Sequence, residues 1–432
     1  MADVLNFKCP CCGAALSFNS DAGEMVCAYC DSHFTMEQVK AAQESEEAAN
    51  GKSDMVWDTH DQEMVSDEDG KLEGYQCPSC GAQMVAGDNT AATECPYCGN
   101  PAIIPQSFSG MYKPDHVIPF KVNKEQAKEA LKSFTKGKKL LPSSFLANNR
   151  IEDITGLYVP FWLYSCHASG SVFFEGVKSK RWSDANYDYV KKDHYFLDRS
   201  GSMDFEKIPV DAATRMDDAM MDSLEPYDMK AAVAYDAAYF SGYLADRYDV
   251  EEADARPRAN ERVINTFRNQ MRSEVGDYEE VSEKSENIKL SNAKAEYAML
   301  PVWMMTTKYQ DKAYTFGING QTGRMVGELP IDKSKYWKYV CLSALIALVI
   351  GSAIAFFAAG KVFNYKAEIA VAVISLLIGF IYGGALKGAM KNVAKQTTAK
   401  AYMKEGSYKR GRFNDRLLYS KTDKKERPKQ NA

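Results

Sequence analysis

The sequence Cys77-Pro-Ser-Cys80-Gly81 … Cys95-Pro-Tyr-Cys98-Gly99 contains two Cys-x-x-Cys pairs with fourteen residues between the inner cysteines. Cysteines three positions apart on a tight turn direct both sulfurs at one cation, and two such turns complete a four-thiolate zinc site. The same spacing occurs upstream in Cys9-Pro-Cys11-Cys12-Gly13 … Cys27-Ala-Tyr-Cys30. The sequence therefore predicts two small β zinc ribbons, over residues 1–34 and 73–105, with two structural zinc ions. The predicted metal ligands are Cys9, Cys12, Cys27, Cys30, Cys77, Cys80, Cys95 and Cys98.

Two further side chains of the first ribbon, Cys11 and His33, are alternative candidates for metal ligands. Cys11 is a surplus thiol, because Cys12 has the two-residue spacing from Cys9 and precedes a glycine as Cys80 does. His33 is a possible substitute ligand, although we prefer to interpret it as a solvated side chain. A redox pair of thioredoxin type needs a single Cys-x-x-Cys, and residues 1–9 contain no apolar export signal for a disulfide framework. Four thiolates leave no open coordination position, so we expect the metals to hold the fold rather than to catalyse.

Charge is distributed unevenly along the 432 residues, although the net charge is only −5. Residues 41–74 carry eleven acidic residues against two lysines, and residues 387–432 carry fourteen basic residues against four acidic ones. This asymmetry predicts an acidic helix or linker over residues 35–72 and a basic cytoplasmic tail over residues 389–432.

Two long uncharged runs lie close together near residue 360. The first extends for twenty-two residues between Lys338 and Lys361, and the second for eighteen residues from Ile369 to Leu386. The first is long enough to span a hydrocarbon core of about 30 Å as a helix. The pair predicts a transmembrane hairpin with helices over residues 338–360 and 368–388, in which Gly351, Gly379 and Gly383 allow close approach.

Lysines flank this hairpin on its outer ends, and they determine the expected orientation. Three lysines precede the hairpin and four follow it, whereas its connecting loop contains two. The positive-inside rule therefore places both termini in the cytoplasm, with the protein in the cell (inner) membrane. A reducing cytosol also keeps thiols available for zinc, which favours the same topology.

Residues 108–332 have the aromatic and β-branched content of a folded domain. A strand over residues 116–122, a helix over 124–134 capped by Asn123, and strands over 156–164 and 170–175 are expected. A similar order follows, with a strand over 242–250, a helix over 251–271, and strands near 300–304 and 313–318.

The peptide Val159-Pro-Phe-Trp-Leu163 is echoed by Leu300-Pro-Val-Trp-Met304. The echo suggests a duplicated strand–helix–strand–strand unit, in which proline favours an edge or a bulge. The predicted fold is thus multidomain, with two small β zinc ribbons, an α+β antiparallel-sheet domain for which duplication is one interpretation, and a two-helix transmembrane hairpin.

The domain contains none of the sequence motifs that mark common catalytic sites. It has no phosphate-binding loop, no His-Glu-x-x-His and no Gly-x-Ser-x-Gly. Cys166 next to His167 suggests a nucleophile, but a packing role on a strand is the better interpretation. We expect no enzymatic activity and no small-molecule substrate.

The paired zinc motifs, the Pro-x-Trp echo, the Asn319-Gly-Gln-Thr-Gly323 turn and the hydrophobic hairpin together resemble bacterial membrane-anchored zinc-ribbon proteins. These are often labelled TFIIB-type zinc ribbon-containing and sometimes primosomal helicase-like. The resemblance implies protein partners of the phage-shock or SPFH envelope-stress type and a scaffold role. The helicase label finds no support, because the sequence has no phosphate loop.

These features are compatible with three classes of function. The preferred one is a non-enzymatic, membrane-tethered adaptor that presents its ribbons to cytosolic or envelope-stress partners. Nucleic-acid binding by the ribbons is disfavoured, because residues 1–34 carry one lysine against four acidic residues. The third is a zinc- or redox-responsive regulator in which Cys11 starts oxidation and metal release.

Overall fold

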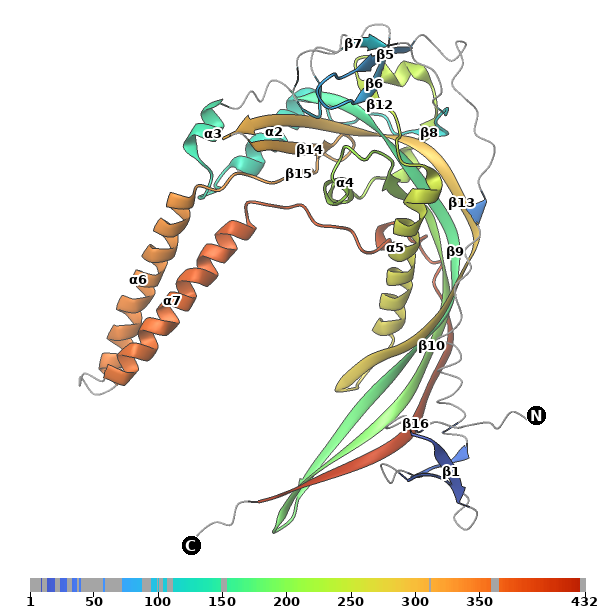
Figure 1. The fold of residues 1–432 in the computed structure, drawn as a ribbon, viewed down its shortest axis with the longest axis vertical. Coiled ribbons are helices and arrows are strands. Elements are labelled where there is room, and N and C mark those ends of the chain that lie inside the picture. The colour runs from blue at the N-terminus through green and yellow to red at the C-terminus, as the bar shows by residue number, and fades with distance from the viewer. Residues whose placement is uncertain are drawn as a thin grey trace.

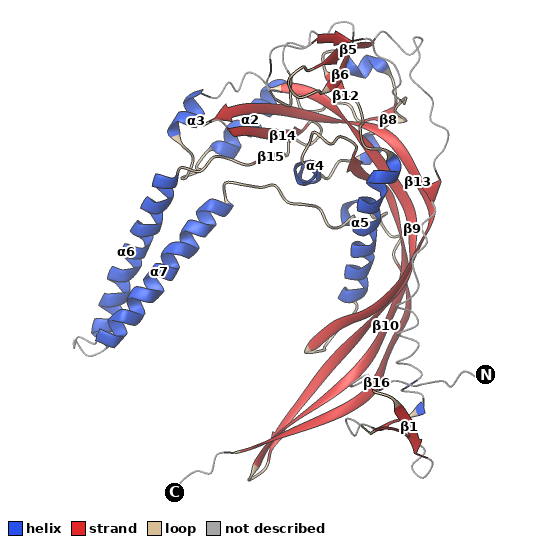
Figure 2. Cartoon of the chain, in the orientation of Figure 1, coloured by secondary structure: helices blue, strands red, loops and turns tan. Residues whose placement is uncertain are grey.

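The structure is a computed structural model, and it describes residues 9, 14–19, 24–28, 33–36, 39, 57–58, 72–87, 95–98, 100, 104–106, 112–148, 154–310, 312–358 and 365–427. Figure 1 shows a central domain from which a helical hairpin and a long, curved sheet extend to the same side. Figure 2 shows one long helix, α5, lying along the concave face of that sheet. Most of the predicted acidic linker, residues 35–72, lies outside the described residues.

Four strands form the long extension, which we call the arm. They are β9 (Thr155–Ser183), β10 (Tyr187–Asp211), β13 (Glu280–Tyr309) and β16 (Lys409–Glu426). The arm consists of residues 169–202, 280–289 and 409–426, in the strand order β13-β9-β10-β16. The sequence predicted a hairpin within residues 156–175, but these residues belong to one continuous strand that bends instead of turning back. Gly170, at φ +158°, lies directly opposite Ile288 in the ladder.

Among the described residues, nine shorter strands extend the same sheet, which is mixed. The shorter strands are β4 (Trp57–Asp58), β5 (Leu72–Gln76), β6 (Gln83–Gly87), β7 (Ile104–Gln106), β8 (His116–Val117), β11 (Val233–Ala234), β12 (Leu244–Asp246), β14 (Lys312–Asn319) and β15 (Met325–Gly327). The prediction of an antiparallel sheet is correct for the long ladders, but β12 pairs with β9, and β8 and β4 pair with β13, in parallel. The second ribbon joins this sheet, because its strand β6 pairs with β12.

The central domain repeats one hydrogen-bond pattern about a local two-fold axis. Val159 and Leu300, equivalent positions of the sequence echo, lie directly opposite each other in the β9–β13 ladder. The indole of Trp162 donates to the carbonyl of Val250 at 2.9 Å, and that of Trp303 donates to the carbonyl of Val122 at 2.8 Å. Each short leading strand pairs with the long strand of the other unit: β8 with β13, and β12 with β9. The two units are therefore interlocked rather than adjacent.

Two prolines occupy equivalent positions in the centre of the sheet, where the sequence predicted an edge or a bulge. The carbonyl of Pro160 accepts the N–H of Ala212 at 3.0 Å, and that of Pro301 accepts the N–H of Gly320 at 2.8 Å. On that side of each long strand, the neighbouring strand changes: from β12 to β10 beside Pro160, and from β8 to β14 beside Pro301. Proline is tolerated because its missing N–H faces the junction between two partner strands.

Helices cover both faces of the sheet and define separate hydrophobic clusters. α5 (Glu252–Ser273) packs through Ala259, Val263 and Phe267 against one face, which includes Trp162 and Phe174. α4 (Asp218–Leu224) covers the opposite face together with the second ribbon. A third cluster joins α2 (Lys124–Thr135) and α3 (Ser143–Asn148) to the base of the hairpin. As predicted, Asn123 caps α2, and it forms a capping box with Gln126.

Buried ion pairs fix α5 to the end of α4. Arg262 forms a bidentate contact with the carboxylate of Glu225, at 2.6 and 3.0 Å, and both side chains are almost fully buried. One turn earlier, Arg258 bridges Asp211 and Asp222 at 2.9 and 3.0 Å. Such pairs contribute little net stability, but loss of one partner leaves an uncompensated buried charge.

The two apolar runs form antiparallel helices, α6 (Lys333–Ala358) and α7 (Tyr365–Gly388), as predicted. Both are long and apolar enough to cross a membrane. The three glycines lie at close approaches between the helices. A Cβ on Gly379 would lie 2.8 Å from the Val340 carbonyl, one on Gly383 would contact the Val340 side chain, and one on Gly351 would lie 2.6 Å from Val371. The hairpin is therefore packed through its small residues.

The sequence predicted a basic tail over residues 389–432, but the described residues 389–427 pack against the domain and the arm. Residues 389–403 cross the domain as an extended strap that includes the short helix η5 (Lys400–Tyr402). The Ser223 hydroxyl accepts the N–H of Ala394 at 2.7 Å, and Thr266 accepts the N–H of Ala399 at 2.7 Å. The strap then enters β16, the outer strand of the arm. The basic residues of β16 (Lys409–Glu426) are thus part of the folded sheet.

We predict that protein stability depends on pH through the buried acids. Burial raises the pKa of Glu225 from 4.5 to about 7, although Arg262 opposes this shift. The folded state then binds an extra proton between these values, so this group's contribution makes stability fall as pH rises from 4.5 to about 7. Glu225→Gln should flatten that slope and also lower stability by about 3–5 kcal/mol, because Arg262 loses its partner. Thermal unfolding in detergent across this pH range measures both effects. Glu261→Gln, on the exposed side of α5, is the control, and an unchanged slope in Glu225→Gln would contradict the prediction.

A second prediction concerns the hairpin. Gly379→Leu should force α6 and α7 apart and lower the unfolding temperature in detergent, because the added atoms meet the Val340 carbonyl. Gly384→Leu is the matched control, since a Cβ at that position has no neighbour within 4 Å. Equal effects of the two substitutions would show that the helices do not pack through Gly379.

Candidate metal centre

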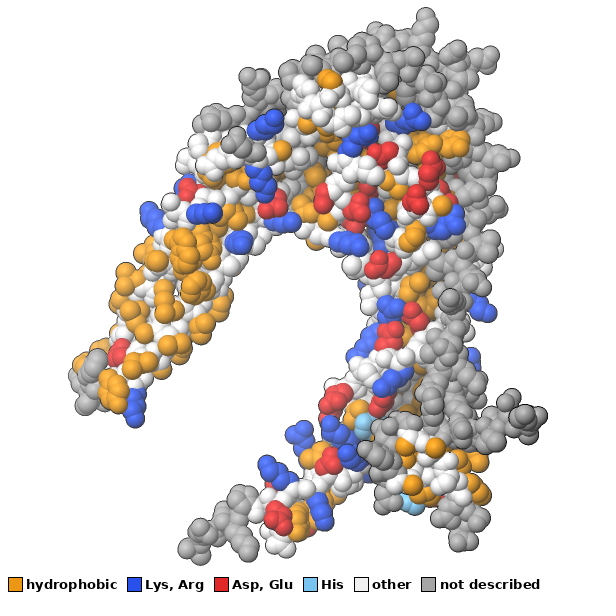
Figure 3. Space-filling view, viewed as in Figure 1, with side chains coloured by type: hydrophobic (Ala, Val, Ile, Leu, Met, Phe, Trp, Pro, Cys, Tyr) orange, Lys and Arg blue, Asp and Glu red, His pale blue; other side chains and the backbone are white. Residues whose placement is uncertain are grey.

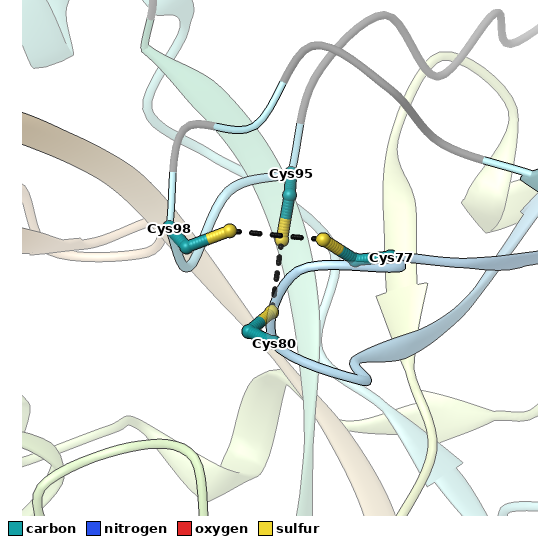
Figure 4. Close-up of side chains that lie close together, drawn as sticks. All are labelled: Cys77, Cys80, Cys95 and Cys98. Atoms are coloured by element: carbon teal, nitrogen blue, oxygen red, sulfur yellow. Dashed lines mark hydrogen bonds between the residues drawn. The ribbon is translucent and has the colours of Figure 1, made fainter.

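Four cysteines of the second ribbon come together at the edge of the sheet. The sulfurs of Cys77, Cys80, Cys95 and Cys98 all lie within 4.8 Å of one another, as Figure 4 shows. The Sγ–Sγ distance is 3.7 Å for Cys77–Cys98 and 3.6 Å for Cys80–Cys95. A tetrahedral site with Zn–S bonds of about 2.3 Å requires sulfurs about 3.8 Å apart. The predicted grouping of these four cysteines is confirmed, and its geometry is consistent with a single structural zinc ion.

Two turns of the same kind present these sulfurs. The N–H of Cys77 donates to the carbonyl of Ala82, and the N–H of Cys95 donates to that of Asn100, both at 2.9 Å. Gly81 has φ +74°, a conformation that favours glycine, and its N–H closes the first turn on the Cys77 carbonyl at 2.8 Å. The glycine after the first pair is therefore needed for the backbone to bend around the site.

The local environment shifts the pKa values of Cys77 and Cys95 in opposite directions. Burial opposes ionisation of Cys77, but backbone N–H groups of Cys80 and Ser79 outweigh it and lower its pKa to about 7. Burial raises the pKa of Cys95. A divalent cation would favour the thiolate form of all four sulfurs, so metal binding would release protons.

Side chains of the central domain hold both turns of the ribbon, and sequence reasoning did not identify them. The hydroxyl of Tyr97, between two ligand cysteines, donates to the buried carboxylate of Asp246. Thr306 donates to the carbonyl of Pro96 at 3.0 Å, and Arg215 donates to that of Gly81 at 3.1 Å. An isolated Tyr, Asp or Arg carries no recognisable signal, so only the fold reveals that the site is attached to the sheet.

The first ribbon is described in part. Its strands β1 (Leu16–Asn19), β2 (Glu24–Cys27) and β3 (His33–Phe34) form a three-stranded sheet within the described residues. The N–H of Cys9 donates to the carbonyl of Ala14 at 2.7 Å, five residues ahead as at Cys77 and Cys95. Cys9 and Cys27 are buried. Cys11, Cys12 and Cys30 lie outside the described residues, so the second zinc site stays a prediction. His33 lies 3.3 Å from Glu24.

The remaining candidate catalytic residues are paired with acids or buried. Cys166 and His167 are successive residues of β9 and point to opposite faces of the sheet. Burial raises the pKa of Cys166 to about 12, whereas His167 contacts Asp204 at 2.6 Å. His194 contacts Glu175 at 2.5 Å. These contacts agree with packing and ion-pair roles rather than with a nucleophile.

Comparison with known proteins identifies a relative. The chain is 31% identical over 332 residues to the uncharacterized protein YdjG of Bacillus subtilis (strain 168), a match that covers 77% of this chain and 92% of the relative. No family model matches the chain. No solved structure matches it either.

We predict a zinc content of two ions per chain, of which Cys77, Cys80, Cys95 and Cys98 hold one. Replacing Cys80 and Cys98 by serine should therefore halve the zinc measured by mass spectrometry of the purified protein. Cys341→Ser, in α6, is the matched control and should leave the content unchanged. A double variant that retains full zinc would show that these cysteines are not the ligands.

Proposed function

The chain belongs to the family that includes YdjG, and we propose that it is a non-enzymatic scaffold, tethered to a membrane by its helical hairpin, that presents zinc ribbons to protein partners. The observation that carries this proposal is the position of the hairpin. The apolar helices project from the domain, while the four-cysteine site is held at another edge of the same rigid sheet. An anchor and a docking module are thus joined by one body.

The surface of the hairpin supports a membrane anchor. Only 11% and 17% of the apolar windows of α6 and α7 are buried. Figure 3 shows hydrophobic side chains covering the visible face of the hairpin. The core helix of a soluble protein would have covered surfaces, whereas lipid accepts an all-round apolar pair whose backbone bonds are satisfied internally.

Lysines at the base of the hairpin support a cytoplasmic location for the domain. Lys138 and Lys139, in the loop between α2 and α3, join the lysines that flank the helices in the sequence. Lys138 donates to the carbonyl of Ala389, and Lys139 contacts the Tyr382 hydroxyl at 3.0 Å. Lys335 donates to the carbonyl of Leu141 at 2.7 Å. A ring of lysine and tyrosine at one end of the helices is the composition expected at a cytoplasmic interface.

The scaffold role is supported by the stiffness of the connections. The second ribbon is fixed through Tyr97–Asp246, Arg215–Gly81 and the β6–β12 ladder, so its outer surface has a set orientation relative to the hairpin. The resemblance described above directs attention to SPFH and phage-shock proteins as partners. A closed four-thiolate site offers a metal no open position for substrate, which agrees with a docking role.

We predict that the loop between the helices lies outside the cytoplasm. In a Cys341→Ser background, Asn364→Cys should react with a membrane-impermeant maleimide in intact cells. Ser241→Cys, on the exposed surface of the domain, should react only after lysis. Labelling of Ser241→Cys in intact cells, or protection of both positions, would contradict the anchor and its orientation.

We further predict that partner recruitment depends on the second ribbon. Full-length protein purified in mild detergent should retain SPFH or phage-shock proteins, and replacement of Cys80 and Cys98 by serine should remove them. Cys341→Ser should retain them. Intact zinc content with no such partner would count against the scaffold.

A further inference from the structure

The tip of the arm carries a surface that neither the ribbons nor the hairpin explain. We define the arm tip as residues 178–193 of the β9–β10 hairpin and residues 420–427 at the end of β16. Its residues lie farther from the central domain than any other part of the long strands (Figure 1). Trp182, on β9 within the tip, is exposed, with 41% of its surface accessible. A large exposed aromatic side chain at this position requires an explanation.

Strand register places aromatic and basic side chains of the tip on one face. Trp182 lies opposite Tyr189, which lies opposite Lys424. In the next row on the same face, Lys180 lies opposite Lys191, and Lys191 lies opposite Thr422. The rings of Trp182 and Tyr189 are stacked, with centroids 5.3 Å apart and planes at 6°. The stack is bordered by lysines from three strands. Two acids lie beside it, because Lys191 pairs with Asp193 at 2.9 Å and the Tyr189 hydroxyl donates to Asp184 at 2.8 Å.

This face is continuous with the concave side of the arm. The β9–β10 ladder shows no register shift between Phe174–Leu197 and the tip, so Trp182 and Phe174 share a face. Phe174 belongs to the cluster that packs against α5. Because α5 lines the concavity, the aromatic face of the tip belongs to the side of the molecule on which the hairpin also lies (Figure 1).

The shape of the molecule restricts how a bilayer can be placed. A polar, charged sheet cannot enter hydrocarbon, so the arm must stay in water while α6 and α7 are inserted. In Figure 1, a straight line from the base of the hairpin to the arm tip leaves the hairpin on one side and the arm, α5 and both ribbons on the other. With a membrane surface along that line, the hairpin crosses the bilayer at an oblique angle. The concave side of the molecule faces the membrane, and the arm reaches the membrane at its tip.

We propose that the arm tip is a second membrane contact, in which Trp182 and Tyr189 enter the interface and Lys180, Lys191 and Lys424 bind anionic phospholipid headgroups. Tryptophan and tyrosine favour the membrane–water interface, and lysines add attraction to an anionic surface. This inference rests on the proposed membrane anchor. The protein then contacts one bilayer at two places, the hairpin and the arm tip. Of these two contacts, only the hairpin spans the bilayer.

The native tryptophans allow each membrane contact to be measured separately by fluorescence quenching. Full-length protein is placed in nanodiscs of brominated phosphatidylglycerol or brominated phosphatidylcholine. Trp57→Phe/Trp337→Phe leaves Trp182 as the exposed reporter, and Trp57→Phe/Trp182→Phe leaves Trp337, in α6. Trp162 and Trp303 are buried in the domain and supply a constant background. Bromine quenches a tryptophan only on contact with the acyl region.

Trp337 should be quenched in both lipids, and Trp182 only in phosphatidylglycerol. High salt should abolish the quenching of Trp182, because exposed charges are then screened. Replacing Lys180, Lys191 and Lys424 by glutamine should do the same. The matched control replaces Lys192, Lys421 and Lys425, which the register places on the opposite face, and should retain it.

Each failure has a distinct meaning. Quenching of Trp337 without quenching of Trp182 would overturn the second contact and leave the anchor intact. Lack of quenching at Trp337 would overturn the anchor itself. Quenching of Trp182 by a single-stranded oligonucleotide, and not by anionic lipid, would assign the tip to nucleic acid and also overturn the inference. Equal loss of quenching with both lysine sets would show that no particular face of the tip contacts lipid.

Discussion

The antiparallel ladder between β9 and β13 is the interaction on which the rest of the structure depends. It joins the long strands of the two repeated units, and Val159 and Leu300 mark its local two-fold centre. Each long strand then receives the leading strand of the other unit in parallel, so neither unit can form its complete sheet alone. Both units contain the same hydrogen bond from a tryptophan indole to a backbone carbonyl. Trp162 donates to Val250, and Trp303 donates to Val122. Because the pairing is reciprocal, a displacement of one unit would break strand pairing in the other. The arm, the second ribbon and the hairpin are all attached to this interlocked pair.

The attachments differ in kind, and the difference follows from what each must do. The second ribbon is held by backbone pairing and by three polar contacts, of which Tyr97–Asp246 is buried and directional. The first ribbon contacts the arm through Phe34 and Tyr419, whose rings lie 6.1 Å apart, and so adheres mainly by apolar packing. The hairpin is joined at both ends to the domain, at residue 332 and through the strap. A metal that stabilises the turns around Tyr97 therefore stabilises an interface as well as a ribbon.

Local signals in the sequence predicted the parts well and their assembly less well. Cysteine spacing identified the four cysteines that come together in the second ribbon, because the constraint is local and chemical. The N-cap residue Asn123 and the uncharged runs identified α2 and the hairpin for the same reason. The Pro-x-Trp echo pointed to repeated units, but it could not show that they exchange leading strands. The continuous β9 was missed because Gly170 is equally compatible with a turn and with a bend. Asp246, Arg215 and Thr306 were missed because their partners are backbone groups or side chains distant in sequence.

The strap connects the two features that we relate to the membrane. It leaves α7 at the base of the hairpin, crosses α4 and α5 through Ser223 and Thr266, and becomes the outer strand of the arm. Arg262 donates to both the strap, at the Thr398 carbonyl, and the buried carboxylate of Glu225. A displacement of α7 along its axis would therefore pull on hydrogen bonds that also position α5 and β16. Since α5 packs against the concave face of the arm, the hairpin and the arm tip are linked through covalent chain and through packed core at once. The strap thus connects the position of the hairpin to that of the arm.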